Sequence, residues 1–354
     1  MNAVVNYFRD LGRATLTGWQ RFWFTPADPA TLGLIRILAG AMLFYTHLVW
    51  GLDLEAFFGR QAWLTPEAVA AFAQSVNGPE ARDFSWSYFW WIDSPRVLWS
   101  VHIAALVVFA LLTVGLFSRT SAVLAYLAAV SYVNRVPGAQ FGLDQINVML
   151  AMYLMVGPCG SAYSLDRLIR KARAGGNLPR LEPSVGANIS IRLIQLHMCI
   201  IYLFAGLSKL AGVAWWDGSA LWLSFANLEY QSLDMTWTAH YPLFISFLTH
   251  VTIAWEVSYA ALVWPKLTRP LVIALAIPLH LGIAFCMGMI TFGLIMLVGN
   301  LAYVSPGLVR SAIDTIFRTR SKEPIAPVAM EPAASSQAPR IPRRKAGNKS
   351  RATH

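Results

Sequence analysis

The chain has 354 residues, of which 56% are hydrophobic and only 13% carry a charge, and its mean hydropathy is +0.50. A water-soluble domain of this length would not have such a composition, so an integral membrane protein is indicated. The net charge of +10 does not indicate nucleic-acid binding, because most of the excess basic residues lie in loops and in the tail beside apolar segments, as the positive-inside rule predicts.

The first 24 residues form the first predicted element. Val4, Val5, Phe8, Leu11 and Trp19 recur at near-helical spacing among polar residues. This pattern predicts an amphipathic helix that lies on the inner leaflet. Residues 1–24 are therefore predicted to be a membrane-surface helix that precedes a transmembrane domain at 25–308.

Eight apolar runs follow. A transmembrane helix needs about 17 to 25 residues, and runs of roughly this length lie at 29–51, 97–117, 120–136, 141–160, 189–212, 241–264, 268–288 and 289–307. The sequence therefore predicts an all-α, polytopic transmembrane helix bundle with about eight spans. The third run is short and little beyond Gly288 separates the last two, so seven or nine spans stay open.

The basic residues predict the orientation. Clusters of Arg and Lys precede the first run and follow the second, fourth, sixth and eighth, whereas residues 213–240 contain no Lys or Arg. If eight helices alternate, every cluster lies on one side, with Arg135 as the exception, and both termini are cytoplasmic. From about residue 319 the chain is rich in Pro, Ala, Ser and basic residues. Residues 309–354 are therefore predicted to be a basic, largely disordered cytoplasmic tail.

Two long outward segments, 52–96 and 213–240, are rich in aromatic residues. They can form an interfacial aromatic belt or a lid over an outward-facing apolar cavity. In the first segment, Thr65 followed by Pro66 predicts the start of a helix. The three cysteines have no CxxC spacing, so the sequence predicts neither a disulfide framework nor a metal site.

Two charged residues inside the predicted spans are expected to form a structural ion pair. At about 1.5 Å per residue, Arg36 and Glu256 lie roughly 10 and 12 Å from the cytoplasmic ends of their helices. Unpaired charges are rare in hydrocarbon. An Arg36–Glu256 pair is therefore predicted in preference to a proton relay. Glu256 also shares one helix face with Thr249, Thr252 and Tyr259, which should point into the bundle.

A third charged residue, Lys209, lies inside the apolar run near its outer end. A charged ammonium is costly in hydrocarbon, so this lysine is paired, with Asp144 as the candidate partner, or extends to the headgroups, or is neutral and reactive. Gly206 lies beside its stem and Tyr202 lies two turns earlier on the same face. That opening suits either a close helix contact or a small ligand.

The run Tyr202-Leu-Phe-Ala-Gly-Leu-Ser-Lys-Leu210, followed by Trp215-Trp-Asp-Gly218, resembles the signature of the HTTM (horizontally transferred transmembrane) family, the vitamin K-dependent γ-carboxylase-like proteins. Shorter matches are Asn134-Arg135 before Asp144, Tyr163-Ser-Leu-Asp-Arg167, and the region from His280 to Met287. The resemblance covers approximately the predicted transmembrane domain, 25–308.

The resemblance implies a quinol-oxygenating enzyme. In carboxylases of this family the lysine at the motif position is thought to deprotonate vitamin K hydroquinone, and it corresponds to Lys209. The family's helix histidine corresponds to His280, which would orient a quinol hydroxyl. A reduced naphthoquinone is then the expected cofactor, with no metal, and the residues expected to contact it are Tyr202, Gly206, Trp215 and Trp216. Ser208 stands where the carboxylases have a second lysine, so protein carboxylation is not expected.

Two functions stay open. The first is an enzyme of the quinol epoxidase or carboxylase-like lyase type, in which Lys209 is an outward-facing base. The second is a non-catalytic membrane protein, such as a partner subunit, an immunity-type protein or a small-molecule carrier, with Lys209 in a structural ion pair. The expected partners are membrane lipid, a quinol in the first case and a protein partner in the second, and no nucleic acid. The resemblance also implies a multi-pass protein of the bacterial inner (plasma) membrane.

Overall fold

The computed structural model describes residues 2–77, 86–177 and 181–317, and every named element in these ranges is a helix. This confirms the all-α prediction. The α-helices are α1 (Asn2–Phe24), α2 (Ala30–Trp50), α3 (Leu54–Phe58), α4 (Pro66–Asn77), α5 (Pro95–Val114), α6 (Ser118–Arg135), α7 (Gly142–Val156), α8 (Leu165–Arg173), α9 (Val185–Leu210), α10 (Val213–Trp216), α11 (Ala220–Phe225), α12 (Pro242–Leu262), α13 (Arg269–Cys286), α14 (Ile290–Asn300) and α15 (Pro306–Phe317). The disorder predicted from about residue 319 lies outside the described residues.

Five helical segments in the described ranges are long and apolar enough to cross a membrane: Ala30–Phe58, Pro95–Val114, Val185–Leu210, Pro242–Leu262 and Arg269–Cys286. Gly142–Val156 and Ile290–Tyr303 are apolar but shorter. The third predicted run, 120–136, is occupied by α6, whose sequence includes several polar residues and ends in Asn-Arg. The chain is thus a polytopic membrane protein, and eight spans remains a prediction.

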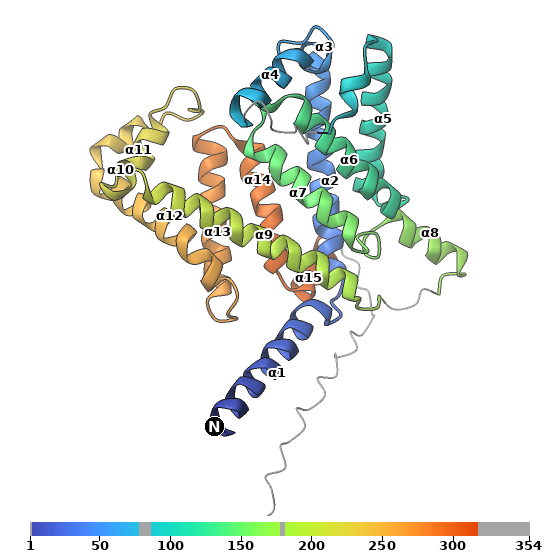
Figure 1. Ribbon diagram of the computed structural model, residues 1–354, viewed down its shortest axis with the longest axis vertical. Helices are drawn as coiled ribbons and strands as arrows, with labels where there is room; N and C mark the ends of the chain where they lie inside the picture. Colours follow the sequence, from blue (N-terminus) through green and yellow to red (C-terminus); the bar gives the residue numbers. More distant parts are fainter. Residues whose placement is uncertain (1, 78–85, 178–180, 318–354) are drawn as a thin grey trace, which may run out of the picture. The chain divides into compact units, whose positions relative to one another are not determined.

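Helix α9 connects several other helices. It packs along α12 and also contacts α1, α7 and α14, and Figure 1 shows it running from α1 toward α10 and α12. At its N-terminal end, the Asn188 side-chain amide donates to the carbonyl oxygens of Phe22 and Trp23, at 2.7 and 2.8 Å. These carbonyls lie at the end of α1, where the helix supplies no donor. Asn188 therefore ties the end of α1 to α9.

The apolar stripe of α1 is uncovered. Val4, Val5, Phe8, Leu11 and Trp19 are between 47 and 63% exposed, although such residues are normally buried. Trp19 contacts Trp23 of the same helix, at a ring-centroid distance of 5.7 Å, and still has 60% of its surface exposed. A membrane surface would cover this stripe, and the position on the inner leaflet stays a prediction.

The outward segment 52–96 contains the predicted helix start. Helix α4 begins at Pro66, and the Thr65 hydroxyl accepts a hydrogen bond of 3.2 Å from a backbone N–H of its first turn, which confirms the prediction. The same segment explains the exceptional position of Arg135. This fully buried side chain donates to the carbonyl oxygens of Leu64 and Gly59, at 2.7 and 2.8 Å. The loop backbone therefore solvates the charge.

The segment Tyr163–Arg167 forms a corner between helices. The Asp166 carboxylate accepts hydrogen bonds from the backbone N–H groups of Phe117 and Ser118, at 2.8 and 2.7 Å, and from the Ser118 hydroxyl at 2.7 Å. Burial raises the pKa of Asp166, but these hydrogen bonds outweigh burial and hold the pKa below its usual range. A carboxylate at the start of α6 also interacts favourably with the helix dipole.

Helices α13 and α14 pack closely at Gly293. A Cβ atom at this position would lie 2.4 Å from the His280 carbonyl oxygen and 2.9 Å from Ala284 Cβ, whereas a Cβ at Gly282 on α13 would meet nothing within 4 Å. We expect Gly293→Ala to lower the free energy of unfolding by about 1–3 kcal/mol, the usual cost of overpacking. Thermal unfolding of the detergent-solubilised protein measures this.

Gly282→Ala is the matched control for that prediction, because it adds the same methyl group on the same helix hairpin without a contact. Its unfolding temperature should stay at or above that of the wild type, since alanine is the better helix former. Equal destabilisation by both substitutions would contradict the proposed close packing.

Candidate functional site

Lys209 forms an ion pair with Glu256. The ammonium Nζ lies 2.9 Å from Oε1 and 2.7 Å from Oε2 of the carboxylate. Only Oε1 has hydrogen-bond geometry, and the buried Oε2 accepts no hydrogen bond from the described residues. The side chains are 25% and 13% exposed. The pair therefore lies in a partly dehydrated environment, where attraction between charges is stronger than in water.

The predicted Arg36–Glu256 pair is wrong. Arg36 is fully buried, and its guanidinium donates to the carbonyl oxygens of Cys159 and Ala162, at 3.2 and 3.4 Å, and of Tyr163 at 2.5 Å. These carbonyls follow the end of α7, where no helical N–H is available to them and the helix dipole is negative. Backbone oxygens thus satisfy the arginine without a carboxylate.

Asp144 is not the partner of Lys209 either. Its carboxylate Oδ2 accepts a hydrogen bond of 2.9 Å from the Phe141 backbone N–H and caps the first turn of α7. The prediction failed because residue counting gives a position along a helix axis, not a depth in the membrane. Helix α9 has 26 residues, so it is about 39 Å long, which exceeds the hydrocarbon thickness of about 30 Å.

The opening expected beside Lys209 is filled by α12. A Cβ atom at Gly206 would lie 2.9 and 3.0 Å from Cγ2 and N of Val257, and 3.2 Å from Glu256 Cβ. Of the two alternatives from sequence, the structure shows the close helix contact. Gly206 lets the two backbones approach until the lysine reaches its carboxylate partner.

Trp215 and Trp216 lie beside the end of α9 in different ways. The Lys209 ammonium lies 5.4 Å from the Trp215 ring centroid, within the range of a cation–π interaction. The Trp216 indole is 65% exposed and donates a hydrogen bond of 2.7 Å to the Leu210 carbonyl oxygen. Trp215 thus contributes to the lysine's surroundings, whereas Trp216 caps the helix.

A hydrogen-bonded chain of buried side chains links four helices. The Tyr259 hydroxyl donates to Asn300 Oδ1 at 2.7 Å, and Asn300 Nδ2 donates to the Tyr202 hydroxyl oxygen at 2.8 Å. The Tyr202 hydroxyl in turn lies 2.6 Å from Nε2 of His280. These residues belong to α12, α14, α9 and α13 respectively, so the chain joins all the helices that surround it.

The direction of the chain assigns the tautomer of His280. Because the Tyr202 oxygen accepts from Asn300, its own proton is free to be donated to Nε2 of His280. The neutral imidazole then carries its proton on Nδ1. This Nδ1 is buried and has no hydrogen-bond partner among the described residues, and the histidine is 4% exposed. An unpaired buried N–H is costly and invites an acceptor.

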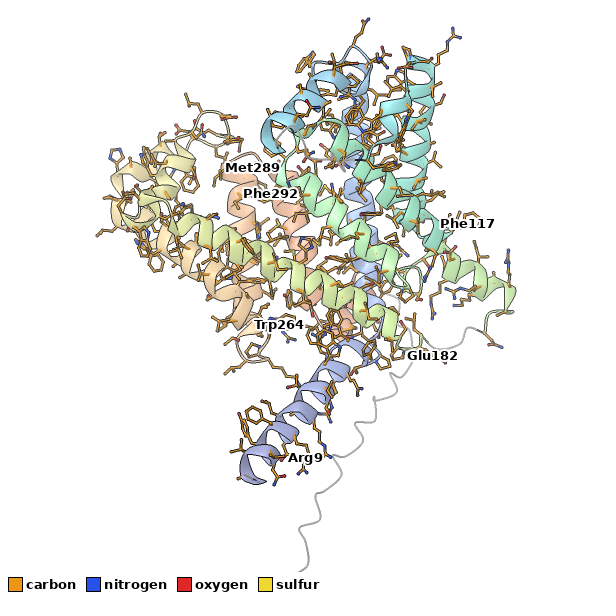
Figure 2. The ribbon with its side chains drawn as sticks, viewed as in Figure 1. Arg9, Phe117, Glu182, Trp264, Met289 and Phe292 are labelled. Atoms are coloured by element: carbon orange, nitrogen blue, oxygen red, sulfur yellow. The ribbon has the colours of Figure 1, made fainter. Side chains whose placement is uncertain are left out.

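The hydrogen-bonded chain of side chains and the Lys209–Glu256 ion pair lie close together. Tyr202 precedes Lys209 by two helical turns on α9, and Glu256 precedes Tyr259 by nearly one turn on α12. The ring of Trp255, which precedes Glu256, lies 6.3 Å from the imidazole of His280 between centroids. The imidazole centroid also lies 6.5 Å from that of Phe292, which Figure 2 labels beside Met289 near the start of α14.

Comparison with protein families matched the HTTM domain over residues 24–307. The chain belongs to the HTTM family. No curated protein and no solved structure matched it. The family assignment covers the whole site of this HTTM protein, because the ion pair and the hydrogen-bonded chain both lie between residues 202 and 300.

Asn300 is the site residue that the sequence analysis missed. Its signal is present in the sequence, because a polar Asn that ends an apolar helix is unusual. Its side chain makes three hydrogen bonds, with Tyr202, Tyr259 and the Met296 carbonyl oxygen. Within the described ranges no three His, Cys, Asp or Glu side chains are grouped so that they could hold a metal ion.

A double-mutant cycle tests the assignment of partners. Lys209→Met and Glu256→Gln should each destabilise this HTTM protein, because each leaves a charged or polar partner unpaired, while the double variant should recover about 1–3 kcal/mol of the summed loss. Thermal or denaturant unfolding in detergent measures the coupling. Arg36→Met combined with Glu256→Gln is the control and should be additive within about 0.5 kcal/mol. Coupling in the second cycle but not in the first would refute the partners described.

Proposed function

We propose that this HTTM protein is a membrane enzyme that binds a hydroquinone, such as a reduced naphthoquinone, and oxygenates it. The observation that carries the proposal is the unpartnered, buried Nδ1–H of His280, whose ring lies 6.3 Å from that of Trp255, the residue before Glu256 of the ion pair. Ionisable residues inside a membrane commonly mark functional sites. The family membership adds support, since the same residues carried the resemblance to quinol-oxygenating carboxylases.

His280 would position the ring compound. Its Nδ1–H can donate a hydrogen bond to a quinol oxygen, and the chain from Tyr259 through Asn300 and Tyr202 keeps the proton on that nitrogen. A fixed donor stabilises the negative charge that develops on oxygen when the hydroxyl loses its proton. None of these four side chains has to rotate when the quinol hydroxyl loses its proton.

Lys209 and Glu256 would take the proton. In hydrocarbon the separated charges can be exchanged for a neutral pair, in which the lysine proton moves to the carboxylate and leaves a free amine. The amine accepts the quinol hydroxyl proton, which gives the quinolate and restores the ammonium. Dioxygen is the oxidant, and one hydroquinone and one dioxygen give one epoxide and one water.

The second candidate is a non-catalytic membrane protein. The observation that favours it is the ion pair itself, because Nζ already has a carboxylate within 2.9 Å and the surface at Gly206 is packed against α12. In this case the pair joins α9 to α12 and Lys209 never becomes neutral.

Quinol oxidation distinguishes the candidates. Purified wild-type protein, mixed with reduced naphthoquinone and ¹⁸O-labelled dioxygen, should form labelled epoxide detectable by mass spectrometry. Lys209→Met should lower the rate at least about 100-fold, the usual contribution of a positioned base. Lys266→Met, which removes an exposed lysine between α12 and α13, is the matched control and should keep the wild-type rate. Absence of turnover in folded wild-type protein would favour the non-catalytic candidate, and equal rates in both variants would remove Lys209 from the mechanism.

We infer a multi-pass protein of the bacterial inner membrane, in which α2, α5, α6, α7, α9, α12, α13 and α14 cross and both termini are cytoplasmic. The distribution of Arg and Lys supports this orientation. Leu228 and Leu267 are matched reporters, because they are 85% and 87% exposed in loops predicted to lie on opposite sides.

Cysteine labelling tests this topology. In a background without the native cysteines, an impermeant maleimide should label Leu228→Cys in spheroplasts and label Leu267→Cys only after permeabilisation. Labelling of both in intact spheroplasts, or the reverse pattern, would contradict the orientation.

A further inference from the structure

A large cavity has neither Lys209 nor Glu256 in its lining. Its volume is about 870 Å³, within the range of small-molecule sites. It is an open cavity, lined by the end of α2, the start of α7, residues 229–232 and the turn between α13 and α14. Met289 and Phe292, labelled in Figure 2, mark its side at that turn.

The lining of this cavity has a distinct chemistry. It includes three carboxylates, Asp53, Asp144 and Glu229, but no Lys, Arg or His. Six aromatic side chains also line it: Tyr45, Trp50, Phe57, Phe141, Tyr230 and Phe292. Carboxylates in a concave, partly apolar surface attract cations, and aromatic faces bind them by cation–π interaction. The cavity should therefore favour a cationic ligand over an anion.

A small recess adjoins the cavity and shares Trp50, Ala139 and Asp144 with it. The volume of the recess is about 10 Å³, which is the space for one water-sized group. A primary ammonium has this size, whereas a quaternary ammonium is too large. Its lining also includes His47 and Asn147.

Asn147 is the observation that points to a bound group. The residue is 2% exposed, and both its Oδ1 and its Nδ2 are buried without a hydrogen-bond partner among the described residues. Buried amides are nearly always hydrogen-bonded, so both polar atoms of this side chain require partners in the recess. Oδ1 requires a donor and Nδ2 requires an acceptor.

Asp144 can supply the charge at the same place. Its Oδ2 accepts the hydrogen bond of 2.9 Å from Phe141, and a carboxylate can accept further hydrogen bonds. His47 holds its Nδ1–H on the Leu43 carbonyl oxygen at 2.7 Å, so the neutral ring presents Nε2 as an acceptor. Among the described residues, Asp144 is the only acidic or basic side chain besides the neutral His47 that lines the recess, so the recess favours a cation.

We propose that the cavity and its recess bind an organic primary ammonium ligand that carries a hydroxyl on the neighbouring carbon and an apolar or aromatic body. The ammonium fills the recess between Asp144 and Asn147 Oδ1, the hydroxyl lies at the mouth of the recess, where its oxygen accepts from Asn147 Nδ2, and the body lies among the aromatic side chains of the cavity. Lys209, Glu256 and His280 do not line this cavity, although Phe292, which lies beside His280, does, and the carboxylates would repel a quinolate.

Binding of 2-amino-1-phenylethanol tests the proposal. Titration calorimetry with the full chain in phosphatidylcholine nanodiscs should show saturable binding at pH 7. Two comparison ligands have the same aromatic body: 1-phenyl-1,2-ethanediol, which is neutral, and 3-phenylpropanoate, which is an anion. We expect the diol to bind at least about tenfold more weakly, since a charge-assisted hydrogen bond is lost, and the anion not to bind.

Three variants locate the site. Asn147→Leu keeps the side-chain volume and removes both unpartnered atoms, so binding of the amine should weaken at least about tenfold while the fold persists. Glu229→Gln alters an exposed loop residue of the lining and should weaken the amine but not the diol. Asp234→Asn is the control, since this nearby acid does not line the cavity, and should leave binding unchanged.

Equal affinity for the amine and the diol would overturn the proposal, because the carboxylates would then play no part. Unchanged amine binding in both Asn147→Leu and Glu229→Gln would also overturn it, by placing the ligand elsewhere. Neither outcome depends on quinol oxidation.

Discussion

Hydrocarbon does not solvate charge, and this constraint explains how the polar groups of the bundle are arranged. Three buried or half-buried cations within the helices find partners of two kinds. Lys209 uses the Glu256 carboxylate, whereas Arg36 and Arg135 use free backbone carbonyls at helix ends and in a loop. Such carbonyls are abundant wherever helices end, and arginine, with five donors in a fixed fork, can bind several at once. The lysine, as a compact charge, needs the carboxylate.

The same constraint makes close helix contact necessary. A lysine can reach a carboxylate on another helix only if the two backbones approach, and Gly206 permits this between α9 and α12. Gly293 has the same effect between α13 and α14 and brings Asn300 and His280 into one network. Gly206 and Gly293 thus permit the close helix contacts on which the polar site depends, although neither has a polar side chain.

The sequence predicted where the helices lie better than which polar side chains pair with each other. Apolar runs located the helices because each run must be as long as the membrane is thick, and Thr65 located a helix start because capping is a local interaction. The Arg36–Glu256 pair failed because partner choice depends on helix tilt and on loop carbonyls, neither of which is encoded in spacing. His280 and Lys209 were predicted from a resemblance, and the structure brings them near each other, but their chemistry remains a proposal. Asn300 was overlooked because a single polar residue at a helix end is a weak signal until its partners are known.

The hydrogen-bonded chain has polarity as well as connectivity. Its donors point in one sense, from Tyr259 on α12 through Asn300 and Tyr202 to His280 on α13. Moving the imidazole proton from Nδ1 to Nε2 would require the Tyr202 hydroxyl, the Asn300 amide and the Tyr259 hydroxyl to turn over together, since each donor would otherwise face another donor. The network therefore couples the tautomer of His280 to the orientation of a hydroxyl on a different helix.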